Sequence, residues 1–133
     1  MDVHVREMLC ECSRMSDEGS KPFGELVMTL IDVGVERYHA DLVRSEKTYH
    51  LTNGESEVVP NEPIGVAPAA AFSAKEVEAA VRAVQAGSIR YKAFCEQVLV
   101  AGCVGYIVSM AGRRVVYYGR TGDSHVEWFP GSK

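Results

Sequence analysis

The sequence predicts a single α+β domain in which helices pack on one face of an antiparallel sheet. The first observation behind this prediction is the composition, with 47% hydrophobic and 24% charged residues in 133, which is typical of one globular domain. The second is a pair of segments with helical periodicity in each half of the chain. The third is that segments of alternating polarity, typical of strands, follow each pair.

The two halves of the chain resemble each other at an offset of 68 positions. Glycines and tyrosines recur at this spacing: Gly34 and Gly102, Tyr38 and Tyr106, Tyr49 and Tyr117, Gly54 and Gly122. We therefore expect one domain over 1–133 built from two ααββ(β) repeats, at about 3–59 and 71–128, related by a pseudo-twofold axis. The proline-containing stretch 60–70 is expected to connect them.

The first helix of each repeat is indicated by apolar residues at helical spacing. The two sets are Val5, Met8, Leu9 and Cys12, and Val77, Ala80, Val81 and Val84. Ser73 and Glu76 match a capping box at the start of the second set. The sequence therefore predicts that a helix begins just after Ser73.

The second helix of each repeat has a longer apolar stripe. Its members are Phe23, Leu26, Val27, Leu30 and Ile31 in the first half, and Tyr91, Phe94, Cys95, Val98 and Leu99 in the second. Ser20 and Ser88 are the expected N-caps of these helices. Gly34 and Gly102 are expected just beyond their C-terminal ends, where glycine takes a positive φ at low cost.

Strands are expected after each helix pair, at 35–43 and 47–51 in the first half. In the second half they are expected around Tyr106, Val108 and Met110 and at 115–119, with short third strands near 57–59 and 125–128. Alternation places Tyr38, Tyr49, Tyr106 and Tyr117 on the helix-covered face. Ala111-Gly112 is expected to be a two-residue hairpin turn.

Charge and hydropathy argue against several classes of function. The net charge is −4 and the basic residues are scattered, so we expect no nucleic-acid partner. The longest apolar run, near 67–72, is too short to span a membrane, and the N-terminus lacks the features of a signal peptide. We therefore expect a cytoplasmic protein without a membrane partner. Its cysteines, Cys10, Cys12, Cys95 and Cys103, are expected to be free thiols.

Two groups of polar residues are candidate sites. His39, Asp41 and His50 would share the outer sheet face, where they could bind a metal or form a solvated surface. Their spacing matches no recognised metal motif, so no cofactor is expected. His125 and Glu127 also share a strand face, as an acid–base pair or, as we favour, a surface strand edge.

Aromatic and apolar residues suggest two binding surfaces. Tyr38, Tyr49, Tyr106 and Tyr117 could line a pocket for a small molecule of unknown identity, or could simply be core residues. On the outer sheet face the second half replaces polar residues with Ile107, Val116 and Tyr118. Exposed apolar surface favours a partner, so we expect a homo-oligomer, most simply a dimer, that covers these residues.

Several segments together resemble a family of small uncharacterised bacterial proteins. These segments are Gly34-Val35-Glu36-Arg37-Tyr38, Tyr49 to Gly54, Tyr91-x-x-Phe94-Cys95, Ala101-Gly102-x-Val104 and Val126-x-x-Phe129-Pro130. The family is known only as a domain of unknown function, and some members are labelled phage envelope protein. The resemblance implies a single α+β domain of bacteria and some phages, with no assigned catalytic residues.

The sequence favours a small non-enzymatic binding or accessory protein that acts through a pocket or groove between the two repeats. One alternative is a small enzyme using a histidine with a carboxylate or metal on the sheet. Another is a virion-associated component, as the family label suggests. No catalytic residue is assigned, because no catalytic motif is present.

Overall fold

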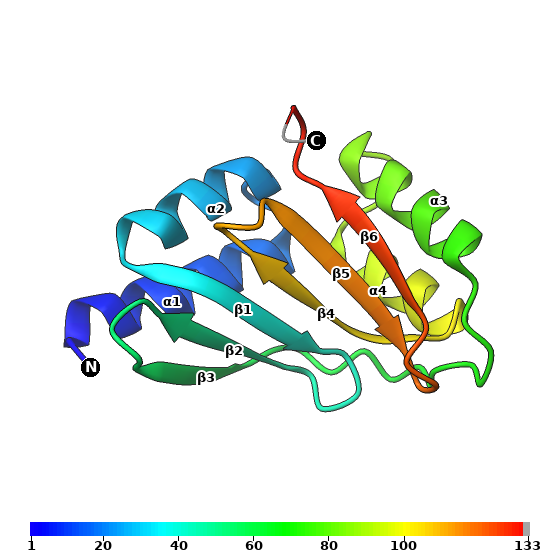
Figure 1. Cartoon of the computed structure of the whole chain (residues 1–133), viewed down its shortest axis with the longest axis horizontal. Helices are drawn as coiled ribbons and strands as arrows, with labels where there is room; N and C mark the ends of the chain where they lie inside the picture. The colour runs from blue at the N-terminus through cyan, green and yellow to red at the C-terminus, as the bar shows by residue number, and fades with distance from the viewer. Residues whose placement is uncertain (132–133) are drawn as a thin grey trace.

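The computed structural model describes residues 1–131 and confirms the α+β prediction, with helices on one side of a six-stranded antiparallel sheet (Figure 1). The elements of the first half are α1 (Val3–Glu18), α2 (Phe23–Asp32), β1 (Val35–Asp41), β2 (Glu46–Leu51) and β3 (Ser56–Pro60). Those of the second half are α3 (Ala74–Gln85), α4 (Tyr91–Val100), β4 (Cys103–Ser109), β5 (Arg114–Gly119) and β6 (Ser124–Trp128).

The sheet joins the halves through its two central strands. The strand order is β3-β2-β1-β4-β5-β6, so β1 pairs with β4 and the two short strands form the edges. The β1–β4 register centres on His39 opposite Ile107, which lie 68 positions apart. This arrangement agrees with two repeats about a pseudo-twofold axis, and the common origin of the halves stays an interpretation.

Local backbone geometry follows the same offset. β4, β5 and β6 begin 68 positions after β1, β2 and β3. Ser45 and Arg113, also 68 positions apart, are the two non-glycine residues with positive φ within the described chain, at 57° and 52°. The connector runs from 61 to 73, because Pro60 still belongs to β3.

The predicted N-caps Ser20 and Ser88 are wrong. The helices begin at Phe23 and Tyr91, after Pro22 and Arg90, and neither preceding residue makes a side-chain cap. The φ of Pro22, −63°, already suits a helix start. The Ser20 hydroxyl instead donates to the Met15 carbonyl, at the end of α1.

The other predicted helix boundaries are confirmed. The Ser73 hydroxyl accepts a hydrogen bond from the Glu76 amide at the start of α3. Gly34 and Gly102 follow α2 and α4 with φ of 96° and 90°. The hairpin prediction at Ala111-Gly112 is wrong in detail, because the residue with positive φ is Arg113 and the connection spans 110–113.

The core lies between the sheet and the helices, and the four predicted tyrosines lie in it. Tyr38, Tyr49, Tyr106 and Tyr117 are all buried. The Tyr38 ring centre lies 5.2 Å from that of Tyr49 and 6.4 Å from that of Tyr106. This aromatic row spans the seam between the halves. Within residues 1–131, no helix has the length and apolar character needed to cross a membrane.

Candidate functional site

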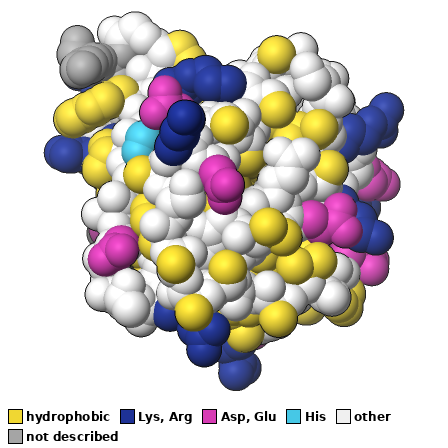
Figure 2. Space-filling view, turned by 90° about the vertical axis from the view of Figure 1, so that its right-hand side faces the viewer, with side chains coloured by type: hydrophobic (Ala, Val, Ile, Leu, Met, Phe, Trp, Pro, Cys, Tyr) yellow, Lys and Arg dark blue, Asp and Glu magenta, His cyan; other side chains and the backbone are white. Residues whose placement is uncertain are grey.

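A groove runs between α3 and the free edge of β6. It encloses about 510 Å³ and is lined by Glu78, Arg82 and Gln85 of α3, by residues 125–128 of β6, and by Pro130. Figure 1 shows α3 alongside β6, and Figure 2 looks onto this side of the molecule, where hydrophobic side chains lie scattered among charged ones. The groove is therefore an open site whose lining mixes charged and apolar side chains, rather than a closed apolar pocket.

Helical spacing puts the α3 side chains on one wall of the groove. Glu78, Arg82 and Gln85 are four and three positions apart, which brings them onto one face of the helix. The neighbouring face of α3, with Val77 and Val81, is buried in the core. The wall is consequently held in place by the packing of the helix.

A buried carboxylate forms the inner wall. Glu127 is 8% exposed, and its Oε1 accepts a hydrogen bond of 2.9 Å from Nη1 of Arg82. Its Oε2 lies 2.6 Å from Nε2 of His125. The Glu127 carboxylate raises the pKa of the Arg82 guanidinium by accepting this hydrogen bond. Both oxygens of a carboxylate with little access to water are thus satisfied.

This geometry corrects the surface interpretation of the His125–Glu127 pair. The pair does share a strand face, but that face is turned toward α3 and Glu127 is buried. The contact could orient His125 as a general base. Among the described residues that line the groove there is no serine, threonine or cysteine to act as its nucleophile.

The edge of β6 carries unpaired backbone groups. Within the described part of the chain β6 pairs only with β5, and the amide of Phe129 donates to the carbonyl of Arg113. Antiparallel pairing alternates, so the backbone groups of Ser124, Val126 and Trp128 point away from β5. These groups can accept another strand.

The opposite edge, at β3, is less open. The amide of Asn61 donates to the carbonyl of Ser45, so by the same alternation Ser56, Val58 and Pro60 point outward. Pro60 has no amide hydrogen to donate. The residue 68 positions later is Trp128, which has one. The two edges of the sheet therefore differ in their capacity to pair.

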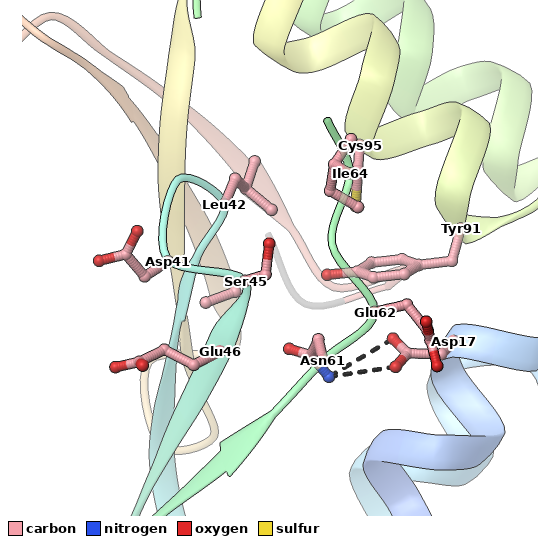
Figure 3. A pocket seen from close by; sticks show the side chains of 11 residues that line it. Asp17, Asp41, Leu42, Ser45, Glu46, Asn61, Glu62, Ile64, Tyr91 and Cys95 are labelled. Atoms are coloured by element: carbon pink, nitrogen blue, oxygen red, sulfur yellow. Dashed lines mark hydrogen bonds between the residues drawn. The ribbon is translucent and has the colours of Figure 1, made fainter. Parts of the chain in front are cut away.

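A second, much smaller hollow lies between the two halves. It encloses about 10 Å³, roughly the space for one water molecule, and is lined by Asp17, Asn61, Tyr91 and Cys95 among others. Figure 3 shows Tyr91 of α4 reaching across and Asn61 turned toward Asp17. The Asn61 amide donates to Asp17 at 3.2 Å and to the Ser13 hydroxyl at 2.7 Å.

Lys47 is a buried cation beside this hollow. Lys47 is 1% exposed, and its Nζ has no hydrogen-bond partner among residues 1–131. The nearest carboxylate oxygen, on Asp17, is 3.9 Å away, too far for a hydrogen bond. Burial lowers the pKa of the Lys47 ammonium, an effect that Asp17 partly opposes. In the sequence, alternation from Tyr49 and Leu51 already places Lys47 on the buried face, and this is the signal that could have identified it.

The buried cysteines are not activated nucleophiles. Burial raises the pKa of the Cys95 thiol to about 12 and that of Cys103 to about 11, which disfavours the reactive thiolate. All four cysteines are free thiols, as expected.

The histidines of the outer face do not converge. His39 contacts the Tyr118 hydroxyl at 2.5 Å through Nε2, and Asp41 accepts hydrogen bonds from the backbone amides of Val43 and Arg44. In the part of the chain that is described, the one group of potential metal ligands within 4.8 Å of each other is Glu78, His125 and Glu127. The geometry therefore does not support a metal at His39, Asp41 and His50.

The other predicted binding residues are located but have no identified ligand or partner. Tyr38, Tyr49, Tyr106 and Tyr117 line neither hollow, so their role as ligand contacts stays a prediction. Ile107, Val116 and Tyr118 lie on the outer sheet face, with Ile107 39% exposed and the other two half-buried. Their coverage by a second copy also stays a prediction.

Comparison with known proteins places the chain in a family without assigning an activity. A search of curated proteins finds no match. A family model described as "Protein of unknown function (DUF1398)" matches residues 16–126, which is most of the chain. The chain therefore belongs to the DUF1398 family of proteins of unknown function.

Proposed function

We propose that this protein is a non-enzymatic binding module that takes an extended segment of a partner protein as an added strand on β6. The observation that carries the proposal is the free backbone edge at Ser124, Val126 and Trp128, which lies beside the groove under α3. Strand addition supplies affinity through backbone hydrogen bonds and specificity through pockets for alternate side chains.

The groove offers different contacts to the two faces of an added strand. Side chains pointing to the helix side would meet Arg82, Glu78 and Gln85. Side chains on the other face would lie beside Val126 and Trp128, which are 39% and 38% exposed. We therefore expect a bound segment that alternates polar residues with apolar or aromatic ones.

The test compares equivalent proline substitutions at the two sheet edges. Val126→Pro removes the central outward amide of β6, and Val58→Pro, 68 positions earlier, removes the matching amide of β3. Peptides selected from a random nine-residue library would be measured with both variants by fluorescence polarisation. We expect Val126→Pro to weaken binding at least tenfold and Val58→Pro to leave it unchanged.

Two results would contradict strand addition. One is that no peptide is enriched by the wild-type protein. The other is that selected peptides bind Val126→Pro as tightly as wild type, while circular dichroism shows both proline variants folded.

Self-association is a separate proposal, carried by the uncovered sheet face. The helices cover one face only, and Ile107 and Val126 stay exposed on the other. A second copy packed face to face would bury them, together with half-buried Val116 and Tyr118. Apolar residues on an uncovered sheet face are typical of such an interface.

A further inference from the structure

We propose that Glu78, His125 and Glu127 form a binding site for a divalent transition-metal cation such as Zn²⁺. One ligand atom from each residue lies within 4.8 Å of the others, on facing sides of the groove between α3 and β6. One imidazole and two carboxylates are a donor set that zinc accepts, and an open fourth position would be filled by water.

Two of the three ligands are held close together on β6, whereas the third is exposed on α3 and can move toward a bound ion. His125 and Glu127 are two residues apart on one strand, and their Nε2 and Oε2 atoms are already 2.6 Å apart. Glu78 is exposed on α3 and can move toward them. Ligand atoms around zinc lie roughly 3.4 Å from one another, so closing the site needs shifts of about 1 Å.

Arg82 supports the site without occupying Oε2 of Glu127, the oxygen that would bind the metal. Its Nη1 donates to Oε1 of Glu127 and leaves Oε2 to face His125. A hydrogen bond to the second oxygen of a ligating carboxylate is the usual way of fixing its orientation. His125 would bind through Nε2 as the Nδ1–H tautomer, so the metal would replace its present contact with Glu127.

Charge and ligand type decide which cation fits. Two carboxylates against one guanidinium leave the groove with a net negative charge, which attracts a cation. Imidazole is a ligand for zinc, cobalt and nickel, whereas magnesium and calcium prefer oxygen donors. The residues 68 positions earlier are Cys10, Glu57 and Val59, so the first half has no equivalent site.

The metal site and strand addition use different atoms of the same groove. The metal would bind side chains that point toward α3, whereas an added strand would bind the backbone of Ser124, Val126 and Trp128. Val126→Pro tests one proposal and His125→Ala tests the other. Failure of either leaves the other standing.

The single tryptophan provides a direct readout of the metal. Trp128 follows Glu127 and lines the same groove, so paramagnetic Co²⁺ at the site should quench its fluorescence. Zn²⁺ binding would be measured in parallel by isothermal titration calorimetry. We expect one equivalent of Zn²⁺ per chain, quenching by Co²⁺ that Zn²⁺ reverses, and no response to Mg²⁺.

Variants decide whether the response comes from the proposed ligands. His125→Ala and Glu127→Gln should weaken Zn²⁺ and Co²⁺ binding at least tenfold, and His50→Ala, a half-buried histidine on the outer face, should not. His125→Ala decides the matter if Glu127→Gln fails to fold by circular dichroism. The proposal is overturned if folded His125→Ala binds as wild type does, or if wild type binds no metal at 1 mM, on the order of the weakest biological cation affinities.

Discussion

The Nζ atom of Lys47 lies 4.6 Å from the centre of the Tyr91 ring, so a cation of the first half faces an aromatic ring of the second half. The Tyr91 hydroxyl is in turn 2.7 Å from that of Tyr106. The ring attracts the ammonium but does not replace the hydrogen bonds that water would make. The residue 68 positions after Lys47 is Val115, which is buried at the matching place in the second half.

Replacing this cation with an apolar side chain of similar length should stabilise the fold. Lys47→Met removes the cost of burying an ammonium that has no hydrogen-bond partner among residues 1–131, and we expect the free energy of unfolding to rise by about 1–3 kcal/mol at pH 7. Lys47→Ala should instead lower it by about 2–4 kcal/mol, because it leaves a cavity. Urea denaturation measures both. A less stable Lys47→Met protein would show that the ammonium has a stabilising partner.

The advantage of Lys47→Met should shrink as the pH rises. The folded pKa of Lys47 is lower than its ordinary value of 10.5, so the unfolded chain binds more protons between these two values. Burial of the charged Lys47 ammonium therefore destabilises the wild type less and less as the pH rises toward 10.5. Other titrating groups are common to both proteins and cancel. Urea denaturation of the wild type and Lys47→Met at several pH values tests this prediction. A stability difference between the two proteins that does not change with pH would contradict it.

Two buried thiols should destabilise the fold at alkaline pH. Cys95 and Cys103 have folded pKa values of about 12 and 11, above the ordinary thiol value of 9.0. Their contribution is complete below pH 9 and is lost as pH rises toward 11–12. Cys95→Ala should flatten this fall, and Cys10→Ala, at an exposed position, should not. Equal slopes in denaturation series of the two variants would argue against burial as the cause.

The equivalent glycines after α2 and α4 should differ in their tolerance of a methyl group. Gly34 has a φ of 96° with nothing within 4 Å of an added Cβ, so Gly34→Ala should cost about 1–2 kcal/mol of backbone strain. At Gly102, φ is 90° and an added Cβ would lie 2.1 Å from the Ala71 carbonyl oxygen. Gly102→Ala should therefore cost about 1–3 kcal/mol more. Thermal denaturation of the two variants gives the comparison, and equal losses would mean that the connector moves aside freely.

The outer sheet face can be tested by its effect on self-association. If the face is the interface of a homodimer, Ile107→Lys should shift the protein to monomers in sedimentation velocity. Met28→Lys, on α2 and 60% exposed, should leave the dimer intact. A wild-type protein that sediments as a monomer at 100 µM, a concentration well above the roughly micromolar affinity of a weak specific pair, would refute the proposed interface.

Most of the fold follows from patterns that are local in the sequence. Apolar residues at helical spacing and the alternation around Tyr38 and Tyr106 were enough to give the order of elements and the buried face. Ser20 is not the N-cap of α2, which begins after Pro22, whose φ of −63° already suits a helix start. Ser88 is not the N-cap of α4, which begins after Arg90 without a side-chain cap. Several neighbouring residues could each have served as the N-cap, so the sequence pattern alone does not fix where these helices begin.

The candidate site was harder to predict, because its contacts are distant in sequence. Arg82 and Glu127 are separated by 45 positions and meet only when α3 packs beside β6. The spacing of His125 and Glu127 predicts that they share a strand face, but it does not predict that this face is turned toward α3. Lys47, in contrast, can be identified from the sequence, because alternation alone places it among buried residues. A charged residue at a buried position is unusual and indicates a position worth testing.

The pairing of β1 with β4 has consequences for separating the two halves and for the evolutionary origin of the chain. Each half without the other would expose the edge of its longest strand, which is the usual route to intermolecular pairing. Because the register centres on His39 opposite Ile107, it maps onto itself when the halves are exchanged. Two copies of one half could therefore pair in the register already used here, as expected if a symmetric dimer became a single chain through gene duplication and fusion.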